Sequence, residues 1–176
     1  MGRPRRISVV KPGAQGFTEA AERHLDDVHA FLVYLTGDRD VAEDLTAETF
    51  ARALERWRRY DPRRGSALTW LCQLARSTAL DHFRSEERRR RREGRYALGV
   101  LEQAPGAFGD GLSPELEAAL ARLSAAEREV LALRVVLDLD GETAARVLGI
   151  STSACSTRLS RALQKLEQEV SAGVAA

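Results

Sequence analysis

The sequence contains few of the residues from which metal and redox sites are built. It has two cysteines and three histidines in 176 residues, and none follows the spacing of a zinc ligand set. Cys72 and Cys155 lie far apart, each within an apolar helical pattern, so we expect two free, buried thiols in a reducing compartment. No phosphate-binding glycine loop and no nucleophile with a neighbouring base is present. The sequence therefore predicts no metal, no cofactor and no enzymatic activity.

Long apolar runs are also missing. None approaches the roughly 20 residues of a membrane-spanning helix, and the arginine-containing N-terminus lacks the apolar segment of a signal peptide. We therefore expect no membrane span and a cytoplasmic protein. The net charge of +1 conceals an asymmetry, because residues 1–95 hold 20 Lys and Arg against 15 Asp and Glu, whereas residues 96–176 hold 7 against 11. The basic character belongs to the N-terminal half.

Proline and glycine divide the chain. Residues 1–16 combine basic residues with proline and glycine and show no periodicity, which predicts a flexible basic arm. Residues 94–112 are similarly punctuated and predict a flexible linker, in which Phe108 could dock on a domain. Elsewhere apolar residues recur at helical spacing. We therefore expect an all-α protein with two small helical domains, residues 17–93 and 113–170, and a tail at 171–176.

An acidic amphipathic helix is predicted from Asp40 to Trp57. Its carboxylates lie in the first half and its arginines in the second, where the helix dipole favours each. The simplest interpretation of such a helix alone is a solvated face. The positions expected to be buried are Val41, Leu45, Ala53, Leu54 and Trp57.

The next predicted helix, residues 69–92, becomes increasingly basic. Seven arginines against three glutamates lie within residues 84–95, and guanidinium groups at this density suit phosphates. The alternative is a solvated helix end. Nearby aromatic rings favour a nucleic-acid role, because unstacked bases of single-stranded DNA rest on such rings. The rings are Trp57, Tyr60, Trp70 and Phe83, of which we expect Trp57 and Phe83 mainly to pack in the core.

The second domain ends in a helix-turn-helix pattern. A short helix ends at Leu148, Gly149 forms the turn, and Ser151 begins a longer helix that exposes small polar residues and arginines. Such a helix fits the major groove, where Ser and Thr contact phosphates and Arg recognises guanine. The alternative is a helical hairpin without a DNA role. Ser113 and Ser124 are predicted to begin the two helices before it.

The first domain resembles region two of bacterial sigma factors of the sigma-70 family, especially the extracytoplasmic-function (ECF) type. The similar segments are AEDLTAETFARAL (42–54), YDPRRGSALTWL (60–71) and LARSTALDHFR (74–84). In that family the acidic helix binds the clamp helices of the polymerase β′ subunit, and the loop and next helix melt the minus-ten element. The resemblance implies that Asp44 and Glu48 bind polymerase. The DNA-binding candidates in this domain are Tyr60, Arg63, Arg64, Trp70, Arg76, Ser77, Arg84 and Arg88.

The second domain resembles region four of the same family, which binds the duplex minus-thirty-five element and the polymerase β flap. The similarity covers LARLSAAEREVLALR (120–134) and STRLSRAL (156–163). The DNA-binding candidates here are Thr152, Ser153, Ser156, Thr157, Arg158 and Arg161. At four positions the sequence differs from the family pattern: Ala47 replaces a usual glutamine, Ser77 a usual asparagine, Thr143 a usual isoleucine and Ser156 a usual lysine or arginine.

Together the two resemblances imply a promoter-specificity subunit that binds core RNA polymerase, recognises two promoter elements and helps to melt DNA. An anti-sigma factor is a further partner that ECF factors often have. The alternative is a helix-turn-helix regulator that binds an operator without polymerase. Two different DNA-binding regions and an acidic docking helix in one short chain favour the sigma factor.

Overall fold

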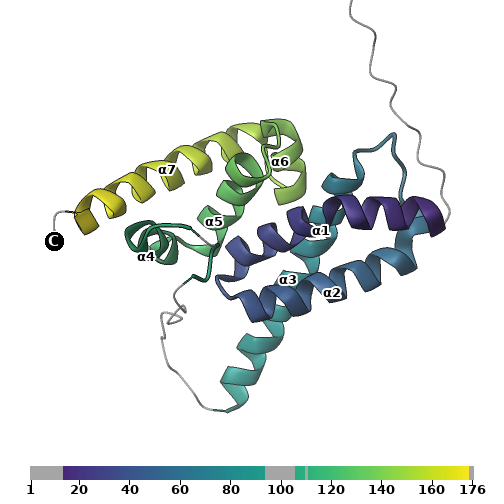
Figure 1. Cartoon of the computed structure of the whole chain (residues 1–176), viewed down its shortest axis with the longest axis horizontal. Coiled ribbons are helices and arrows are strands. Elements are labelled where there is room, and N and C mark those ends of the chain that lie inside the picture. The colour runs from purple at the N-terminus through teal and green to yellow at the C-terminus, as the bar shows by residue number, and fades with distance from the viewer. Residues whose placement is uncertain (1–13, 94–105, 110, 175–176) are drawn as a thin grey trace, which may run out of the picture.

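The computed structural model describes residues 14–93, 106–109 and 111–174, and every regular element within them is a helix. The predicted all-α class is therefore confirmed, with one group of helices, α1 to α3, followed by a second, α4 to α7 (Figure 1). Most of the predicted arm and linker, at residues 1–13 and 94–105, lies outside the described residues.

The first group packs three long helices around an apolar core. They are α1 (Ala14–Thr36), α2 (Arg39–Arg56) and α3 (Ala67–Arg92), with a 3₁₀ turn, η1 (Trp57–Arg59), after α2. Gly37 ends α1 as predicted, in a left-handed conformation with φ of 68°. The side chain of Asp38 then accepts the first backbone N–H groups of α2, and that of Ser66 does the same for α3.

The prediction that Leu54 is buried is wrong, because 57% of this residue is exposed. Ala53 instead completes the buried stripe of α2, and Leu54 lies about 100° further around the helix. Two threonines belong to the same stripe. Thr46 and Thr49 are tolerated there because each hydroxyl donates to the carbonyl oxygen four residues earlier, at 2.6 Å. The buried face of α2 is therefore narrower and more polar than the apolar periodicity predicts.

The second group consists of four helices and one irregular turn. They are α4 (Pro114–Arg122), α5 (Ala125–Leu131), the π-helical turn η2 (Ala132–Val136), α6 (Gly141–Leu148) and α7 (Thr152–Val174). Ser113 and Ser124 begin α4 and α5 as predicted, and Ser124 forms a full capping box with Glu127. Gly149, at φ of 67°, makes the predicted turn between α6 and α7.

Two helices extend beyond the predicted domain limits. α1 begins at Ala14, inside the predicted arm, and Gly16 is buried. α7 continues to Val174, inside the predicted tail. The reason at the C-terminus is packing against α4, since a Cβ atom on Gly173 would lie 3.7 Å from the Cβ of Glu115.

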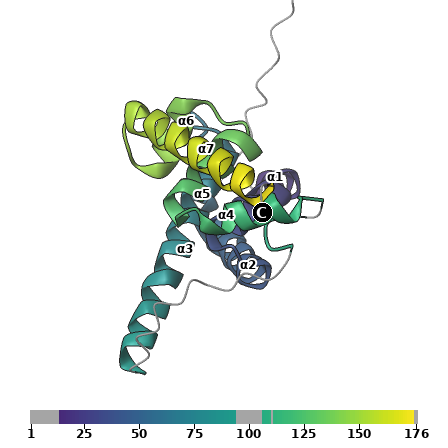
Figure 2. The ribbon, with the colours of Figure 1, turned by 90° about the vertical axis from the view of Figure 1, so that its left-hand side faces the viewer.

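The two groups form one body in this structure. α1 packs against α5 and η2, and α3 packs against α6, so that buried residues of both groups belong to a single apolar core. The end of the linker takes part, because Phe108 is buried at this junction. Figure 2 shows that the C-terminal turns of α3 extend away from all other helices. The junction therefore covers part of α3 and leaves its basic end free.

Candidate nucleic-acid interface

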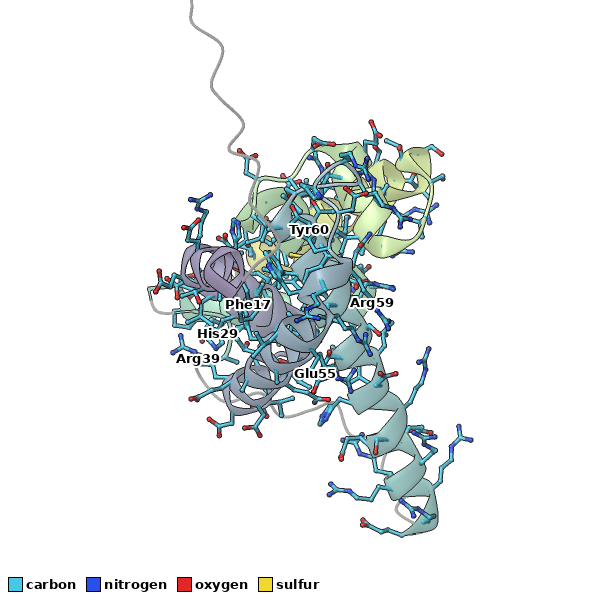
Figure 3. The ribbon with its side chains drawn as sticks, turned by 90° about the vertical axis from the view of Figure 1, so that its right-hand side faces the viewer. Phe17, His29, Arg39, Glu55, Arg59 and Tyr60 are labelled. Carbon is cyan, nitrogen blue, oxygen red and sulfur yellow. The ribbon has the colours of Figure 1, made fainter. Side chains whose placement is uncertain are left out.

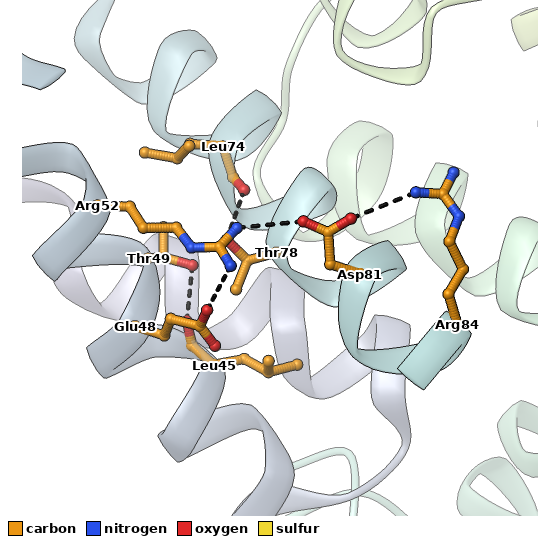
Figure 4. Close-up of polar contacts among 8 residues, drawn as sticks. All are labelled: Leu45, Glu48, Thr49, Arg52, Leu74, Thr78, Asp81 and Arg84. Atoms are coloured by element: carbon orange, nitrogen blue, oxygen red, sulfur yellow. Dashed lines mark hydrogen bonds and ion pairs between the residues drawn. The ribbon is translucent and has the colours of Figure 1, made fainter. Parts of the chain in front are cut away.

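The acidic face of α2 is exposed and connected to α3 by ion pairs. Glu48 pairs with Arg52 at 2.6 Å, Arg52 with Asp81 of α3 at 3.3 Å, and Asp81 with Arg84 at 3.3 Å (Figure 4). Asp44, one turn before Glu48, is also exposed. Because these groups are accessible to water, each pair stabilises the fold by no more than about 1 kcal/mol. Their effect is to hold a predicted polymerase-binding residue and a predicted DNA-binding residue in one network.

The loop between α2 and α3 is built on a cluster of aromatic rings. Trp57 is buried and stacks on Tyr60, with ring centroids 4.8 Å apart and planes 23° apart. Phe17 and Trp70 each pack against Trp57 in a T-shaped arrangement, with ring centroids 5.5 and 5.7 Å from that of Trp57. Figure 3 labels two of these rings, Tyr60 and Phe17. The expectation that Trp57 packs in the core is confirmed, while Tyr60 and Trp70 are half-buried and present partly exposed rings.

Local hydrogen bonds fix this loop. The hydroxyl of Tyr60 donates to the Gly65 carbonyl at 3.2 Å, and burial is the main cause that raises its pKa above the ordinary value. Arg63 donates its backbone and side-chain N–H groups to Asp61 at 3.0 Å, and these bonds hold the pKa of Asp61 below its usual range. The Arg63 side chain is nevertheless 88% exposed. The hydrogen-bonded loop thus exposes the Arg63 cation in the same segment that carries the Tyr60 ring.

The outer face and free end of α3 form a basic surface. Ser77, Arg84 and Arg88 are exposed on it, and nitrogen-tipped side chains surround the projecting end of the helix in Figure 3. Part of the charge is neutralised within the helix, since Arg89 pairs with Glu86 at 2.9 Å and Arg91 with Glu87 at 2.8 Å.

Arg76 lies on the same helix but not on the free surface. Its Nε donates to Oε1 of Glu129 in α5 at 2.5 Å, and the Glu129 side chain is only 5% exposed. Burial raises the pKa of Glu129, against the opposing effects of Arg76 and Arg158. Arg64 is also at the junction, where its carbonyl accepts from Arg146 of α6 at 3.5 Å. The structure therefore places the Arg76 side chain at the junction, whereas the Arg64 side chain stays exposed beside it.

The start of α7 is open to solvent. Thr152, Ser153, Ser156, Thr157 and Arg161 are exposed, and Arg158 is half-buried. An open cavity of about 500 Å³ lies between this face and the start of α5. Residues from both helices line it, including Ser124, Glu127, Ser153, Thr157, Arg158 and Arg161. All six candidates of the second domain therefore lie at the first turns of one accessible helix, as a groove-binding helix requires.

The sequence did not indicate Arg128 and Glu129 as functional residues. Both are charged and at most 6% exposed, because they face the first helical group. The sequence did contain one signal of their burial, because both charged residues lie within the apolar pattern of residues 120–134. Both cysteines are buried and free, as predicted, and burial raises the pKa of Cys72 to about 12. Among the described residues no group of His, Cys, Asp and Glu could hold a metal ion. The same part of the chain contains no helix suited to crossing a membrane.

Comparison with known proteins identifies both helical groups. The family profile "Sigma-70 region 2" matches residues 20–89, and "Sigma-70, region 4" matches residues 113–166. The ECF RNA polymerase sigma factor EcfG of Rhodopseudomonas palustris is 36% identical over 145 residues, which cover 79% of this chain and 76% of that protein. The chain belongs to the ECF sigma factors.

Other relatives of this sigma factor agree with the assignment. The probable RNA polymerase sigma-C factor of Mycobacterium bovis is 33% identical over 161 residues, 91% of this chain and 86% of that one. The sigma factor RpoE from Bartonella quintana, solved in complex with the anti-sigma factor NepR, superposes with a TM-score of 0.73 at 26% identity, covering 90% of this chain and 98% of that chain. The predicted role as a promoter-specificity subunit of RNA polymerase is confirmed, and the operator-binding alternative is not favoured.

Proposed function

We propose that this ECF sigma factor binds core RNA polymerase through the acidic face of α2 and promoter DNA through two surfaces of different chemistry. The observation on which this rests is the separation of three exposed sets of side chains: carboxylates on α2, rings and arginines around α3, and hydroxyls and arginines at the start of α7. Each set suits one target, and no step of covalent chemistry is required. The protein acts in the cytoplasm, where the polymerase is.

The polymerase contact uses Asp44 and Glu48. Both are exposed on one face of α2, one helical turn apart. Their target is the clamp helices of the β′ subunit, and region four adds a contact to the β flap. The ion pair from Glu48 to Arg52 presents the carboxylate in a defined position, which reduces the entropy lost on binding.

The minus-ten element is melted and held by the first domain. Tyr60 and Trp70 provide ring surface for unstacked bases, while Arg63, Arg84 and Arg88 are exposed for phosphates of the non-template strand. The minus-thirty-five element is recognised as duplex by the start of α7, where short side chains let the helix approach the bases. Because polymerase holds both domains at one spacing, weak individual contacts suffice together.

An anti-sigma factor is a further proposed partner. The relative from Bartonella quintana was solved with one bound, and it covers 90% of this chain. Co-purification of tagged sigma factor from its own cells, with the bound protein identified by mass spectrometry, tests this part.

Run-off transcription tests the proposal as a whole. Purified core polymerase is mixed with a library of genomic fragments, with and without the sigma factor, and transcript starts are sequenced. The expected result is a set of discrete new starts preceded by two motifs at constant spacing. New starts that share only one motif would contradict the assignment of separate roles to α3 and α7. No new starts with folded protein would contradict the polymerase-dependent role.

A further inference from the structure

The basic segment before α1 has no part in the contacts proposed so far. Residues 1–13, which we call the arm, contain four cationic residues and no acidic one. The cationic residues are Arg3, Arg5, Arg6 and Lys11. Neither family profile reaches the arm, because the region-two match begins at residue 20 and the region-four match at residue 113. The chemistry of the arm therefore belongs to this chain and not to the family pattern.

We infer that the arm is a further DNA-binding segment, which contacts phosphates of the melted strand next to the bases held by the aromatic loop. The inference rests on the proposed binding of that strand by Tyr60, Trp70 and Arg63. Three features of the molecule support it: the point at which the arm joins the folded domain, the charge around that point, and the reach of the arm.

The first turn of α1 places the arm beside the aromatic loop. α1 begins at Ala14, directly after the arm, and Gly16 is buried. The ring of Phe17 packs against Trp57 with centroids 5.5 Å apart, and Trp57 stacks on Tyr60 at 4.8 Å. Figure 1 shows the start of α1 beside the end of α2, which leads into the loop. The arm therefore joins the domain within two ring contacts of the surface proposed for unstacked bases.

The protein surface at this point is itself basic. Residues 55–64 contain five arginines against two acidic residues, and one of these acids, Asp61, already pairs with Arg63 at 3.0 Å. Arg58 and Arg59 are exposed in this segment, and Arg59 is labelled in Figure 3. Two neighbouring basic segments repel each other, and a polyanion between them removes that repulsion. A strand of DNA is therefore a better partner for the arm than the domain to which it is attached.

The length of the arm limits which phosphates it can contact. A flexible chain of 13 residues spans about 20 Å, equal to about six nucleotides at the duplex spacing of about 3.4 Å. Arg84 lies 17 residues beyond Ala67, the first residue of α3, and therefore about 25 Å along the helix from the loop. Arg88 lies one turn further. We therefore expect the arm and the free end of α3 to contact opposite ends of the bound strand.

Attachment to the domain increases the effect of weak phosphate contacts. Once the loop holds the bases, the arm meets the neighbouring phosphates at an effective concentration set by its length. Each phosphate of single-stranded DNA that a cation neutralises adds about 0.7 to the slope of log affinity against log salt concentration. Contacts from the arm are therefore measurable as a steeper dependence of affinity on salt.

The test uses the full chain bound to core polymerase, with fluorescent oligonucleotides that carry the minus-ten sequence identified by run-off transcription. A short oligonucleotide contains the element alone, and two longer ones extend it by about six nucleotides, the span of the arm, on one side or the other. The charge variant combines four substitutions: Arg3→Gln, Arg5→Gln, Arg6→Gln and Lys11→Gln. The matched control changes the same arm and keeps its charge, with Ile7→Ala, Val9→Ala and Val10→Ala.

We expect the charge variant to lower the salt slope by about 1.4 to 2.8, the contribution of two to four phosphate contacts, on one of the longer oligonucleotides only. The short oligonucleotide and core polymerase should bind the charge variant as tightly as they bind the wild type. The apolar control should match the wild type in every measurement.

Several outcomes would overturn the inference. An unchanged slope on both longer oligonucleotides excludes the arm contact, and an equal loss on the short one shows a general effect of net charge instead. Weaker binding of either arm variant to core polymerase assigns the arm to a protein contact.

Arg63→Ala, measured on the short oligonucleotide, tests the strand surface itself. A slope lowered by about 0.7 in Arg63→Ala, with no effect of the arm on any oligonucleotide, overturns the arm contact alone. An unchanged slope in Arg63→Ala contradicts the proposed strand surface on which the arm contact depends.

Discussion

The two surfaces that we propose for DNA binding differ in chemistry. The surface on α3 combines aromatic rings with long cationic side chains, whereas the start of α7 presents mostly short hydroxyl side chains and two arginines. Rings offer stacking to bases that have left the duplex, and short side chains let a helix enter a groove whose bases remain paired. Of the α3 candidates, Arg76 is partly covered by the second helical group, through its pair with Glu129. The comparison therefore favours different targets for the two proposed surfaces, the melted strand for α3 and duplex DNA for α7.

The largest effect is expected from loss of core polymerase binding, on which both DNA-binding surfaces depend. Reversal of Asp44 and Glu48 to arginine should weaken core polymerase binding by about 100-fold or more, because two charge pairs at the interface become repulsive and each costs about 2 kcal/mol. Competition binding against a labelled sigma factor measures the loss. Glu55→Arg, an exposed change on the same helix, is the control and should retain near-normal affinity. Equal losses in both variants would show a general charge effect instead of a docking site.

A second prediction separates the α7 surface from α3. Arg158→Ala combined with Arg161→Ala should reduce discrimination of the upstream element by about 30-fold or more, because each arginine contact to a base is worth about 1–3 kcal/mol. Transcription is compared on promoters with intact and scrambled upstream elements. Polymerase binding should stay normal, as should binding of a single-stranded minus-ten oligonucleotide. An equal loss of affinity for the single-stranded oligonucleotide would contradict the assignment of these arginines to the upstream duplex element.

The third prediction concerns the projecting end of α3, which extends away from the other described helices. Arg88→Ala should lower the slope of log affinity against log salt concentration by about 0.7 for single-stranded DNA, the contribution of one phosphate contact. Arg91→Ala is the matched control on the same end, because Arg91 is already paired with Glu87 at 2.8 Å. An identical slope for Arg88→Ala and the wild type would show that Arg88 makes no phosphate contact.

Local sequence signals predicted several of the helix ends, and long-range packing explains what they missed. Ser124 with Glu127, and Gly149, act within one turn of the chain, so their roles follow from short segments. The burial of Glu129 depends instead on Arg76, 53 positions away, and no local pattern contains that information. For the same reason the sequence predicted two separate domains and correctly named Phe108 as able to dock, without indicating where. The family resemblance identified the candidate residues, and the structure shows which of them are covered.

The smallest effect is expected from a substitution that adds a hydrogen-bonding group to the α3 surface. Ser77 is exposed on α3, next to the covered Arg76, at a position where the family usually has asparagine. An asparagine amide adds both a donor and an acceptor with longer reach than a hydroxyl. Ser77→Asn should therefore tighten binding of the minus-ten oligonucleotide by about 3- to 10-fold, the equivalent of one additional hydrogen bond of about 1 kcal/mol. A gain on duplex DNA of unrelated sequence would instead indicate nonspecific contact, and Ser85→Asn, an exposed serine further along the helix, controls for that effect.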